Sequence, residues 1–318
     1  MAMNPQSATR NSQSSILAVH PGALGDVILF GHLLGRLHGT VTLVAGGEKG
    51  KLLEGLGVVD RALEFDALPI HEVFTDTPLE QCRCPAMLGE HDRLISCFAG
   101  SDRSAELRLA AMCAAGSAAF LPTRPPPGSD AHLLELWADL LGVDLPTGRQ
   151  SPPWAVPEAW KQDARGALRE AGIDPSRSYA AIHPGSGSPD KCWDLDRFVA
   201  LGRRLGRTVP AVFLLGPVER ERWGRGACEA VGAEFPTLLC PPLTVLAAAL
   251  AAAKCYVGND SGVSHLAATV GTPALVIFGP TSPRHFAPVG KTVRTLAADS
   301  LEEISVAGAL DRLGEWLG

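Results

Sequence analysis

Short apolar runs alternate with longer helical patterns along most of the sequence, and this alternation constrains the fold more than any other feature. Near-continuous apolar runs between helices are typical of parallel strands that are buried on both faces of a sheet. The sequence therefore predicts an α/β fold with open, doubly wound parallel sheets. The expected strands are Ile16–His20, Val41–Ala45, Asp92–Phe98, Tyr179–His183, Ala211–Leu215, Lys254–Gly258 and Ala274–Phe278.

Two proline-rich stretches, 121–127 and 145–157, interrupt the alternation. Proline cannot continue a helix, and 318 residues suggest about two domains. We place the boundary in the second stretch, which gives one Rossmann-like domain at 16–150 and another at 151–318. The spacing Ser300–Glu303 is that of a capping box that opens a final helix to Trp316. The other expected helices are Val27–Leu37, His132–Leu141, Leu195–Leu205, Glu219–Val231, Val245–Ala253 and Ser264–Val270.

Composition excludes several classes of protein. The net charge of −6 argues against a general nucleic-acid binder, which normally has a basic domain. The longest apolar stretch, Leu243–Ala253, is shorter than the ~20 residues that span a bilayer. Residues 1–15 are polar and lack the apolar core of a secretory signal, so we expect a disordered tail on a cytoplasmic protein.

The eight cysteines show no spacing typical of a metal site or a disulfide framework. Cys82 and Cys84 form only a C-x-C pair, and their function stays open. The others lie in apolar contexts, so we expect reduced, buried thiols and no bound metal.

Three loops combine glycine with chemically active side chains. The first is His20–Asp26, which joins the first strand to the first helix. Gly22 and Gly25 allow a tight turn and close approach to a ligand, and Asp26 falls at the helix N-terminus. Asp26 is then either a helix N-cap or a functional carboxylate, and the two roles are compatible.

The second loop is His183–Trp193, which also follows a strand and precedes a helix. Ser186 and Gly187 offer a hydroxyl and exposed backbone N–H groups, and Lys191 adds a compact positive charge. This combination suits a phosphate, although an ordinary polar loop with a solvated lysine fits the same spacing.

The third loop is Gly258–Ala268, where a strand ends and a helix begins near Val263. The free N–H groups of the first helical turn favour an anion, Gly262 permits close approach, and His265 lies one turn into the helix. A capped helix with a core-facing histidine is the alternative. A serine-hydrolase interpretation fails, because Asn259 stands where a nucleophile elbow needs glycine.

Three further patterns give only weak indications of a functional site. The D-x-D pattern Asp194–Asp196 occurs in metal-dependent sugar transfer, but acidic residues are favoured at a helix start anyway. The segment 46–51 lacks the length and the Ser/Thr of a Walker A loop. The arginines from Arg203 to Arg225 fall on amphipathic helices and are predicted to be solvated.

Together, the three loops resemble glycosyltransferase family 9, the ADP-heptose:lipopolysaccharide heptosyltransferases. The matching residues are Gly22–Leu29, His183–Ser186 with Lys191–Trp193, and Tyr256–Ala268 continuing to Phe278–Thr281. The resemblance implies a GT-B fold, with the acceptor on the N-terminal domain and the nucleotide-sugar on the C-terminal domain. It also implies that the final helix, 300–317, packs back across the hinge onto the N-terminal domain.

The resemblance further implies roles for individual residues. Asp26 matches the general base of the family, and Gly22 and Gly25 lie in the loop on the acceptor side. Lys191 would hold the donor phosphates. The other residues implied in donor binding are Ser186, Gly187 and Gly262 at the phosphates, with Ser261 in the same stretch, Glu219 at the ribose, Asp260 at the donor sugar and His265 at the pyrophosphate.

These roles describe an inverting, metal-independent transfer of a sugar, expected to be heptose from ADP-heptose, onto a lipopolysaccharide-core-type acceptor. The expected protein is a monomer without a cofactor that touches the inner membrane surface only transiently. Cys192 and Asp194 depart from the family pattern around Trp193. The segment 66–90 matches no family motif and falls where acceptor-binding loops lie, so the acceptor stays unidentified.

Two other functions stay open. The first strand–helix–strand unit, with Gly22, Gly25 and Glu48, is compatible with an NAD-dependent oxidoreductase, although its glycine spacing is not G-x-G-x-x-G. A non-catalytic nucleotide-sugar-binding protein on the same fold would keep the phosphate loops.

Overall fold

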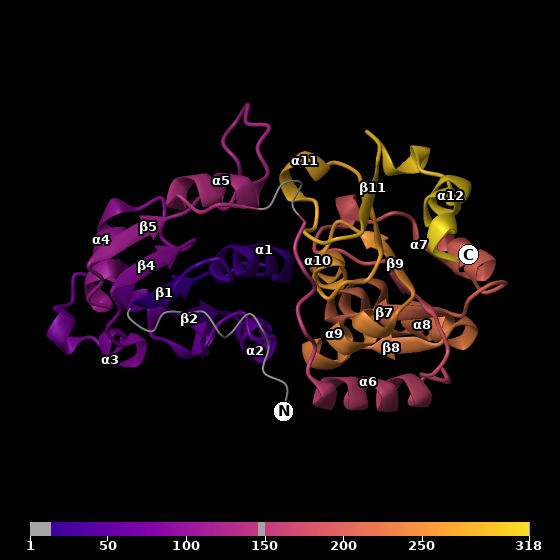
Figure 1. Ribbon diagram of the computed structural model, residues 1–318, viewed down its shortest axis with the longest axis horizontal. Helices are drawn as coiled ribbons and strands as arrows, with labels where there is room; N and C mark the ends of the chain where they lie inside the picture. Colours follow the sequence, from indigo (N-terminus) through magenta and orange to yellow (C-terminus); the bar gives the residue numbers. More distant parts are fainter. Residues whose placement is uncertain (1–13, 146–149, 318) are drawn as a thin grey trace. The chain divides into compact units, whose positions relative to one another are not determined.

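The computed structural model describes residues 14–145 and 150–317. The chain divides into two compact units, Met1–Leu145 and Pro146–Gly318, and the division falls inside the proline-rich stretch. Each unit is built around one sheet (Figure 1). Residues 1–13 of the expected tail at 1–15 lie outside the described residues. Ser15 belongs to the first strand, so the tail does not extend to residue 15.

The first unit has a five-stranded sheet in the order β3-β2-β1-β4-β5, with parallel pairing throughout. A run of three 3₁₀ turns, Phe65–Ala67, Ile70–Phe74 and Leu79–Gln81, follows β3. The strands and helices are β1 (Ser15–Val19), α1 (Leu24–Leu34), β2 (Thr40–Ala45), α2 (Lys49–Gly55), β3 (Arg61–Glu64), α3 (Cys84–Leu88), β4 (Arg93–Ser96), α4 (Arg103–Met112), β5 (Ser117–Phe120) and α5 (Leu133–Leu141).

The second unit has a six-stranded sheet in the order β11-β10-β9-β6-β7-β8, again parallel throughout. The 3₁₀ turns Pro189–Lys191 and Leu301–Glu303 lie in its loops. The strands and helices are α6 (Glu158–Glu170), β6 (Ala180–His183), α7 (Leu195–Leu205), β7 (Ala211–Leu215), α8 (Pro217–Glu234), β8 (Thr237–Leu239), α9 (Leu243–Ala252), β9 (Cys255–Asn259), α10 (Gly262–Thr269), β10 (Ala274–Phe278), α11 (Pro283–Phe286), β11 (Val293–Ala297) and α12 (Val306–Leu317).

The central strands explain why the apolar runs predict the fold. Every residue of β6, β7, β9 and β10 is buried, including both faces of each strand. Parallel sheets require this, because the connecting helices cover both sides. The predicted α/β fold with doubly wound parallel sheets is confirmed.

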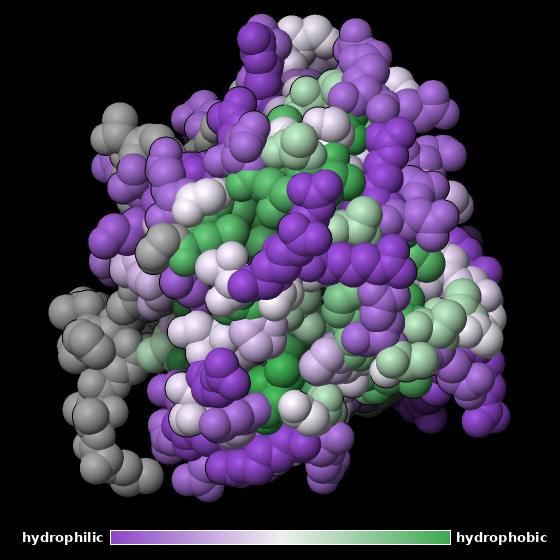
Figure 2. Space-filling view, turned by 90° about the vertical axis from the view of Figure 1, so that its right-hand side faces the viewer, coloured by the Kyte–Doolittle hydropathy of each residue, from purple (hydrophilic) through white to green (hydrophobic). Residues whose placement is uncertain are grey.

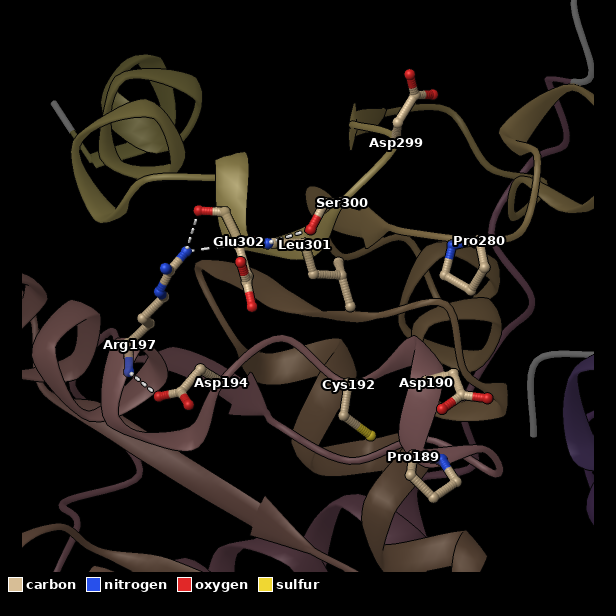
Figure 3. A pocket seen from close by; sticks show the side chains of 10 residues that line it. All are labelled: Pro189, Asp190, Cys192, Asp194, Arg197, Pro280, Asp299, Ser300, Leu301 and Glu302. Carbon is tan, nitrogen blue, oxygen red and sulfur yellow. Dashed lines mark hydrogen bonds between the residues drawn. The ribbon is translucent and has the colours of Figure 1, made fainter.

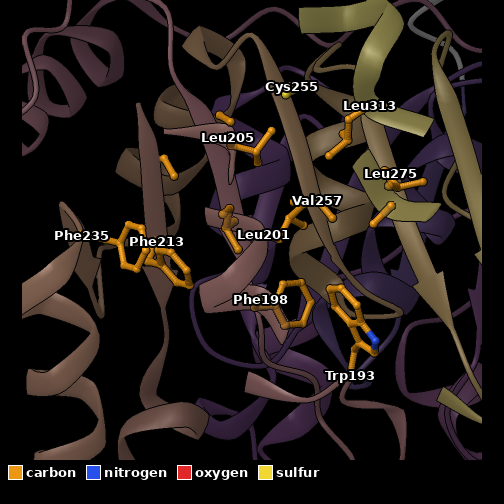
Figure 4. Close-up of a cluster of buried hydrophobic side chains, with 14 of the residues drawn as sticks. Trp193, Phe198, Leu201, Leu205, Phe213, Phe235, Cys255, Val257, Leu275 and Leu313 are labelled. Carbon is orange, nitrogen blue, oxygen red and sulfur yellow. The ribbon is translucent and has the colours of Figure 1, made fainter. Parts of the chain in front are cut away.

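The core of the second unit joins the sheet to α7 and α12 (Figure 4). Trp193 lies at its edge, is fully buried, and packs edge-to-face on Phe198 with ring centroids 4.9 Å apart. Its indole Nε1 donates to the carbonyl oxygen of Ile304 at 3.0 Å. This bond ties the loop before α7 to the segment before α12.

The structure corrects the start of the final helix. Ser300 accepts a hydrogen bond from the backbone N–H of Glu302, but this caps only the 3₁₀ turn. The backbone at Ile304 is extended, so the helix begins at Val306. Helix α12 packs against α7, β9 and β10, and its Leu313 belongs to the core of the second unit. The expected contact of this helix with the N-terminal domain stays a prediction.

The surface seen from the side of α7, α8 and α12 is mainly hydrophilic, with hydrophobic side chains visible between the polar ones (Figure 2). Within residues 14–145 and 150–317, none of the helices combines the length and the apolar character needed to cross a membrane.

Replacing Trp193 by alanine is expected to lower the free energy of unfolding of the second unit by about 3–5 kcal/mol, because it removes a buried aromatic ring and leaves a cavity. Chemical denaturation measures the change. Leu239→Ala is the control, since Leu239 is 49% exposed and its loss should change stability by less than about 0.5 kcal/mol. Equal effects of the two substitutions would contradict the assignment of Trp193 to the core.

Candidate functional site

The candidate site of the second unit lies where the strand order reverses. The chain runs from β6 outward to β7 and β8, then returns to the other side of β6 for β9 and continues to β10 and β11. His183, the last residue of β6, pairs with Gly258 of β9, so the loops after these two strands leave the sheet side by side. In open α/β sheets, ligands bind outside the carboxyl ends of the strands at this kind of switch point.

Asn259 holds the two loops together. Its amide Nδ2 donates to the carbonyl oxygen of Pro184 at 2.8 Å, and its Oδ1 accepts from the N–H of Trp193 at 2.9 Å. Ser186 adds a bond from its hydroxyl to the backbone oxygen of Asp260 at 2.7 Å. Asn259 is fully buried, so its side chain fixes both ends of the loop 184–193 from inside the protein.

Gly185 is needed because Glu219 packs directly against its backbone. A Cβ atom at Gly185 would lie 1.7 Å from Glu219 Oε1. Glu219 is buried, and its Oε2 accepts from the N–H of Gly216 at 2.6 Å, which closes the N-terminus of α8. At Gly187, two residues on, no atom lies within 4 Å of a Cβ, so that side of the loop is open.

Lys191 and Asp260 form an ion pair across the two loops. Lys191 Nζ lies 2.8 Å from Asp260 Oδ2, and the hydroxyl of Thr281 donates to the same oxygen at 2.7 Å. Asp260 is 6% exposed, whereas Lys191 is 31% exposed. The lysine is therefore only partly solvated: its ion pair holds the positive charge at the mouth of the switch point, where it remains accessible.

The N-terminus of α10 lies next to this pair. Ser261 is the N-cap, and in the part of the chain that the structure describes its side chain makes no capping hydrogen bond. The first N–H groups of a helix carry partial positive charge and attract anions. The ammonium group of Lys191 and the N–H groups of the turn Ser261–Gly262 thus provide two sources of positive potential at one place.

His265 lies one turn into α10 and is buried. Burial lowers the pKa of His265 to about 4, against an opposing effect of Asp260, and Lys191 lowers it further. Its Nδ1 has no hydrogen-bond partner among the described residues. His265 is therefore a neutral imidazole near neutral pH with one polar atom unused by the protein.

Arg222 is exposed, like the other arginines from Arg203 to Arg225, which confirms that these arginines are solvated, but it also contacts the loop after β6. Its guanidinium donates to the carbonyl oxygens of Ser186 at 3.1 Å and Gly187 at 3.2 Å. By engaging these oxygens from α8, Arg222 neutralises the electronegative side of the loop. Helical periodicity places Arg222 on a polar face but does not reveal this contact.

A cavity of about 580 Å³ lies beside the loop that carries Lys191 (Figure 3). Its walls come from the loop after β6, from Arg197 of α7, from Pro280 and from the segment 299–302. Four carboxylates against one arginine make them acidic: Asp190, Asp194, Asp299 and Glu302. The carboxylate of Asp194 accepts hydrogen bonds from the backbone N–H groups of Asp196 and Arg197, so the D-x-D pattern caps α7. Across the described residues, no three His, Cys, Asp or Glu side chains are grouped so that they could hold a metal ion.

The first unit has its own switch point between β1 and β4. Asp26 is the third residue of α1, and Ala23, not Asp26, is the N-cap. A Cβ at Gly22 would lie 2.6 Å from the ring of His20 and 3.4 Å from Asp26 Oδ2, so this glycine permits close packing of the two side chains. Lys49 Nζ donates to the carbonyl oxygen of Gly22 at 2.8 Å and steadies the turn.

Gly25 is buried inside α1, where it contributes to the packing of the helix and not to the turn. Burial lowers the pKa of His20 to about 4. Asp26 thus projects from the first turn of a buried helix, beside a neutral histidine.

Comparison with known proteins gives one consistent family. The model of glycosyltransferase family 9 (heptosyltransferase) matches residues 130–316. Lipopolysaccharide heptosyltransferase 3 of Escherichia coli is 30% identical over 180 residues, which are 54% of this chain and 51% of that protein. The chain thus spans about half the length of this curated relative.

Two solved structures share the fold over nearly the whole chain. A glycosyltransferase family 9 protein from Veillonella parvula has a TM-score of 0.77 at 20% identity, covering 98% of this chain and 99% of its own. The E. coli heptosyltransferase WaaC with ADP has a TM-score of 0.67 at 19% identity, covering 95% and 99%.

Gly185→Ala is expected to destabilise the second unit by about 1–3 kcal/mol, because the new methyl group must displace the carboxylate of Glu219. Gly187→Ala, in the same loop but facing open space, should change stability little. Thermal unfolding of the two variants checks the contrast, and equal melting temperatures would show that Glu219 does not occupy this position.

The stability of the second unit should fall as the pH is lowered from 6.5 towards 4. His265 stays neutral in the folded protein but binds a proton in the unfolded chain in this range, so its contribution is complete above pH 6.5 and is lost below it. Between pH 7 and pH 5 the loss from this group is about 2 kcal/mol. Urea unfolding of His265→Gln should show a correspondingly smaller loss, and the full wild-type pH dependence in the variant would refute the assignment.

Proposed function

The chain belongs to glycosyltransferase family 9, the heptosyltransferase family, and from this premise we propose that it transfers a heptose from ADP-heptose to a saccharide acceptor of the lipopolysaccharide-core type. The proposed reaction is an inverting displacement without a metal. The Lys191–Asp260 pair beside the N-terminus of α10 is the observation that carries the proposal. A solved relative of the same fold is WaaC with ADP, which supports a nucleoside diphosphate as the ligand.

The donor diphosphate is proposed to bind where Lys191 now meets Asp260. Lys191 exchanges its carboxylate partner for a phosphate oxygen, and the N–H groups of Ser261 and Gly262 bind the other oxygens. Ser186 and Gly187 close the site from the loop after β6, which Arg222 and Asn259 hold in shape. In this arrangement His265 Nδ1 gains a polar neighbour, and Glu219 is proposed to bind the ribose.

Asp260, released from Lys191, is proposed to face the donor sugar. The carboxylate remains anchored by Thr281, so it can accept a hydrogen bond from a sugar hydroxyl without moving far. The leaving diphosphate gains negative charge as the glycosidic bond breaks. Lys191 and the helix N–H groups stabilise that charge most strongly in the transition state, which is how binding accelerates the reaction.

Asp26 is proposed as the general base. It takes the proton of an acceptor hydroxyl while that oxygen attacks the anomeric carbon from the face opposite the diphosphate. The bond to the diphosphate breaks as the new one forms, and the configuration inverts. Gly22, in the turn of this loop, is proposed to lie on the acceptor side, whereas Gly25 packs inside α1.

We further propose that the acceptor is a glycolipid or saccharide and that the protein acts as a monomer in the cytoplasm. Its contact with the inner membrane surface is proposed to be transient.

Lys191→Ala is expected to weaken ADP binding by about 10- to 100-fold, the loss of one or two charge-assisted hydrogen bonds. Calorimetric titration measures the change. Lys161→Ala is the matched control, because Lys161 is a half-exposed lysine paired with Glu158 on α6. Undiminished ADP affinity in Lys191→Ala would remove Lys191 from the donor site.

Asp26→Asn is expected to lower turnover by about 10²–10⁴-fold while ADP binding stays unchanged, because the amide keeps the shape but cannot accept the proton. Release of ADP in the presence of acceptor measures turnover. Asp102→Asn is the control, since Asp102 only caps α4 and asparagine caps equally well. Near-wild-type turnover in Asp26→Asn would show that another group is the base.

A further inference from the structure

The first unit carries an exposed aromatic side chain at the carboxyl edge of its sheet. Phe74 is 56% exposed, although it packs edge-to-face on Phe98 with ring centroids 5.6 Å apart. Phe98 packs in the same way on Phe65, at 5.2 Å. Phe65 directly follows β3, and Phe98 follows β4, so this phenylalanine cluster stands on the ends of the strands.

The turn that presents Phe74 is braced from α4. Arg108 Nε donates to the carbonyl oxygen of Glu72 at 2.7 Å, and its Nη2 donates to the carbonyl oxygen of Thr77. The carboxylate of Glu72 in turn accepts the N–H group of Cys84 at 2.8 Å. The backbone is thus anchored on both sides of Phe74, so little conformational freedom is lost when a ligand covers the ring.

The phenylalanine cluster shares its edge with Asp26. Phe98 directly follows Cys97, a buried residue whose N–H donates to the carbonyl oxygen of Val19 at the end of β1. Burial raises the pKa of the Cys97 thiol, and the negative charge of Asp26 raises it further, which places the carboxylate nearby. The exposed ring and the proposed base therefore belong to the same end of the same sheet.

The charge around Phe74 restricts what can bind there. Residues 65–80, which form the turns beside Phe74, contain four carboxylates and no arginine or lysine, and Arg108 of α4 adds one positive charge at these turns. A ligand with several negative charges would be repelled by this segment, whereas an uncharged one would not. An aromatic face is electron-rich and attracts the slightly positive C–H groups of an apolar surface. The C–H face of a sugar ring is a surface of this kind.

We propose that Phe74 is an acceptor platform, on which an uncharged sugar ring of the acceptor stacks. The platform rests on the proposed function, because it assigns the acceptor class for the same transfer. It also gives a role to the segment 66–90, which matches no family motif. Cys82 then serves the brace, since its Sγ lies 3.2 Å from Arg108 Nη2.

The test uses methyl β-glucoside and methyl β-glucuronide, two probes that differ by one carboxylate. Saturation-transfer NMR titrations on the full chain give the affinity for each probe. The wild-type protein is expected to bind the glucoside more tightly than the glucuronide. Phe74→Leu keeps an apolar side chain but removes the ring, and should weaken glucoside binding by about fivefold or more.

Phe74→Trp should restore binding, a result that a merely structural role of Phe74 would not require. Leu140→Ala is the matched control, because Leu140 is an equally exposed hydrophobic residue of the first unit and lies on α5, outside the cluster. Its glucoside affinity should equal that of the wild type.

Three outcomes would overturn the platform: no binding of the glucoside by the wild type, unchanged glucoside affinity in Phe74→Leu, or tighter binding of the glucuronide. ADP titration of the same samples separates this result from the proposed function, because the donor site belongs to the second unit. If ADP binds while one of these outcomes occurs, only the platform fails; if ADP does not bind, the proposed donor site fails as well.

Discussion

The side chain of Asn259 makes the hydrogen bonds on which the geometry of the second unit depends. It ends β9, yet its amide bonds to backbone groups at both ends of the loop that leaves β6. Parallel pairing brings the ends of β6 and β9 together, and Asn259 converts that proximity into a fixed distance between two loops. Without this link, Lys191 and Asp260, which are 69 residues apart in sequence, would not be held face to face.

The second consequence is electrostatic. A lysine, a helix N-terminus and a neutral histidine converge at one end of the sheet, while Arg222 covers the carbonyl oxygens of the loop between them. In the described structure, Asp260 is the acidic partner of Lys191 at this point, and it carries a second bond to Thr281. The charges of Lys191 and Asp260 therefore balance each other while the two residues are paired. When Lys191 leaves Asp260, its positive charge attracts an anion. A diphosphate spreads its charge over several oxygens, so it can contact Lys191 and the N-terminus of α10 together, which a single carboxylate does less well.

Apolar patterning predicts the central strands well, because their residues are buried on both faces and leave no room for polar side chains. It misses the edge strands β3, β5, β8 and β11, which are short or only partly buried and carry polar residues such as Arg61 and Thr237. The family resemblance, which rests on the three glycine-containing loops, is confirmed. Contacts such as Arg222 with Ser186, or Thr281 with Asp260, join residues distant in sequence and have no local signal. Likewise, the contact of Arg108 with the segment 66–90 joins residues distant in sequence and has no local signal.

The central claim is that the switch point between β6 and β9 binds the diphosphate of a nucleotide. A crystal structure of the chain with ADP bound tests it most directly. The account predicts phosphate density at the loop Gly185–Gly187 and the N-terminus of α10, with Lys191 Nζ moved from Asp260 to a phosphate oxygen. Nucleotide bound instead at the loop His20–Asp26 of the first unit would contradict the account and favour a dinucleotide-binding enzyme.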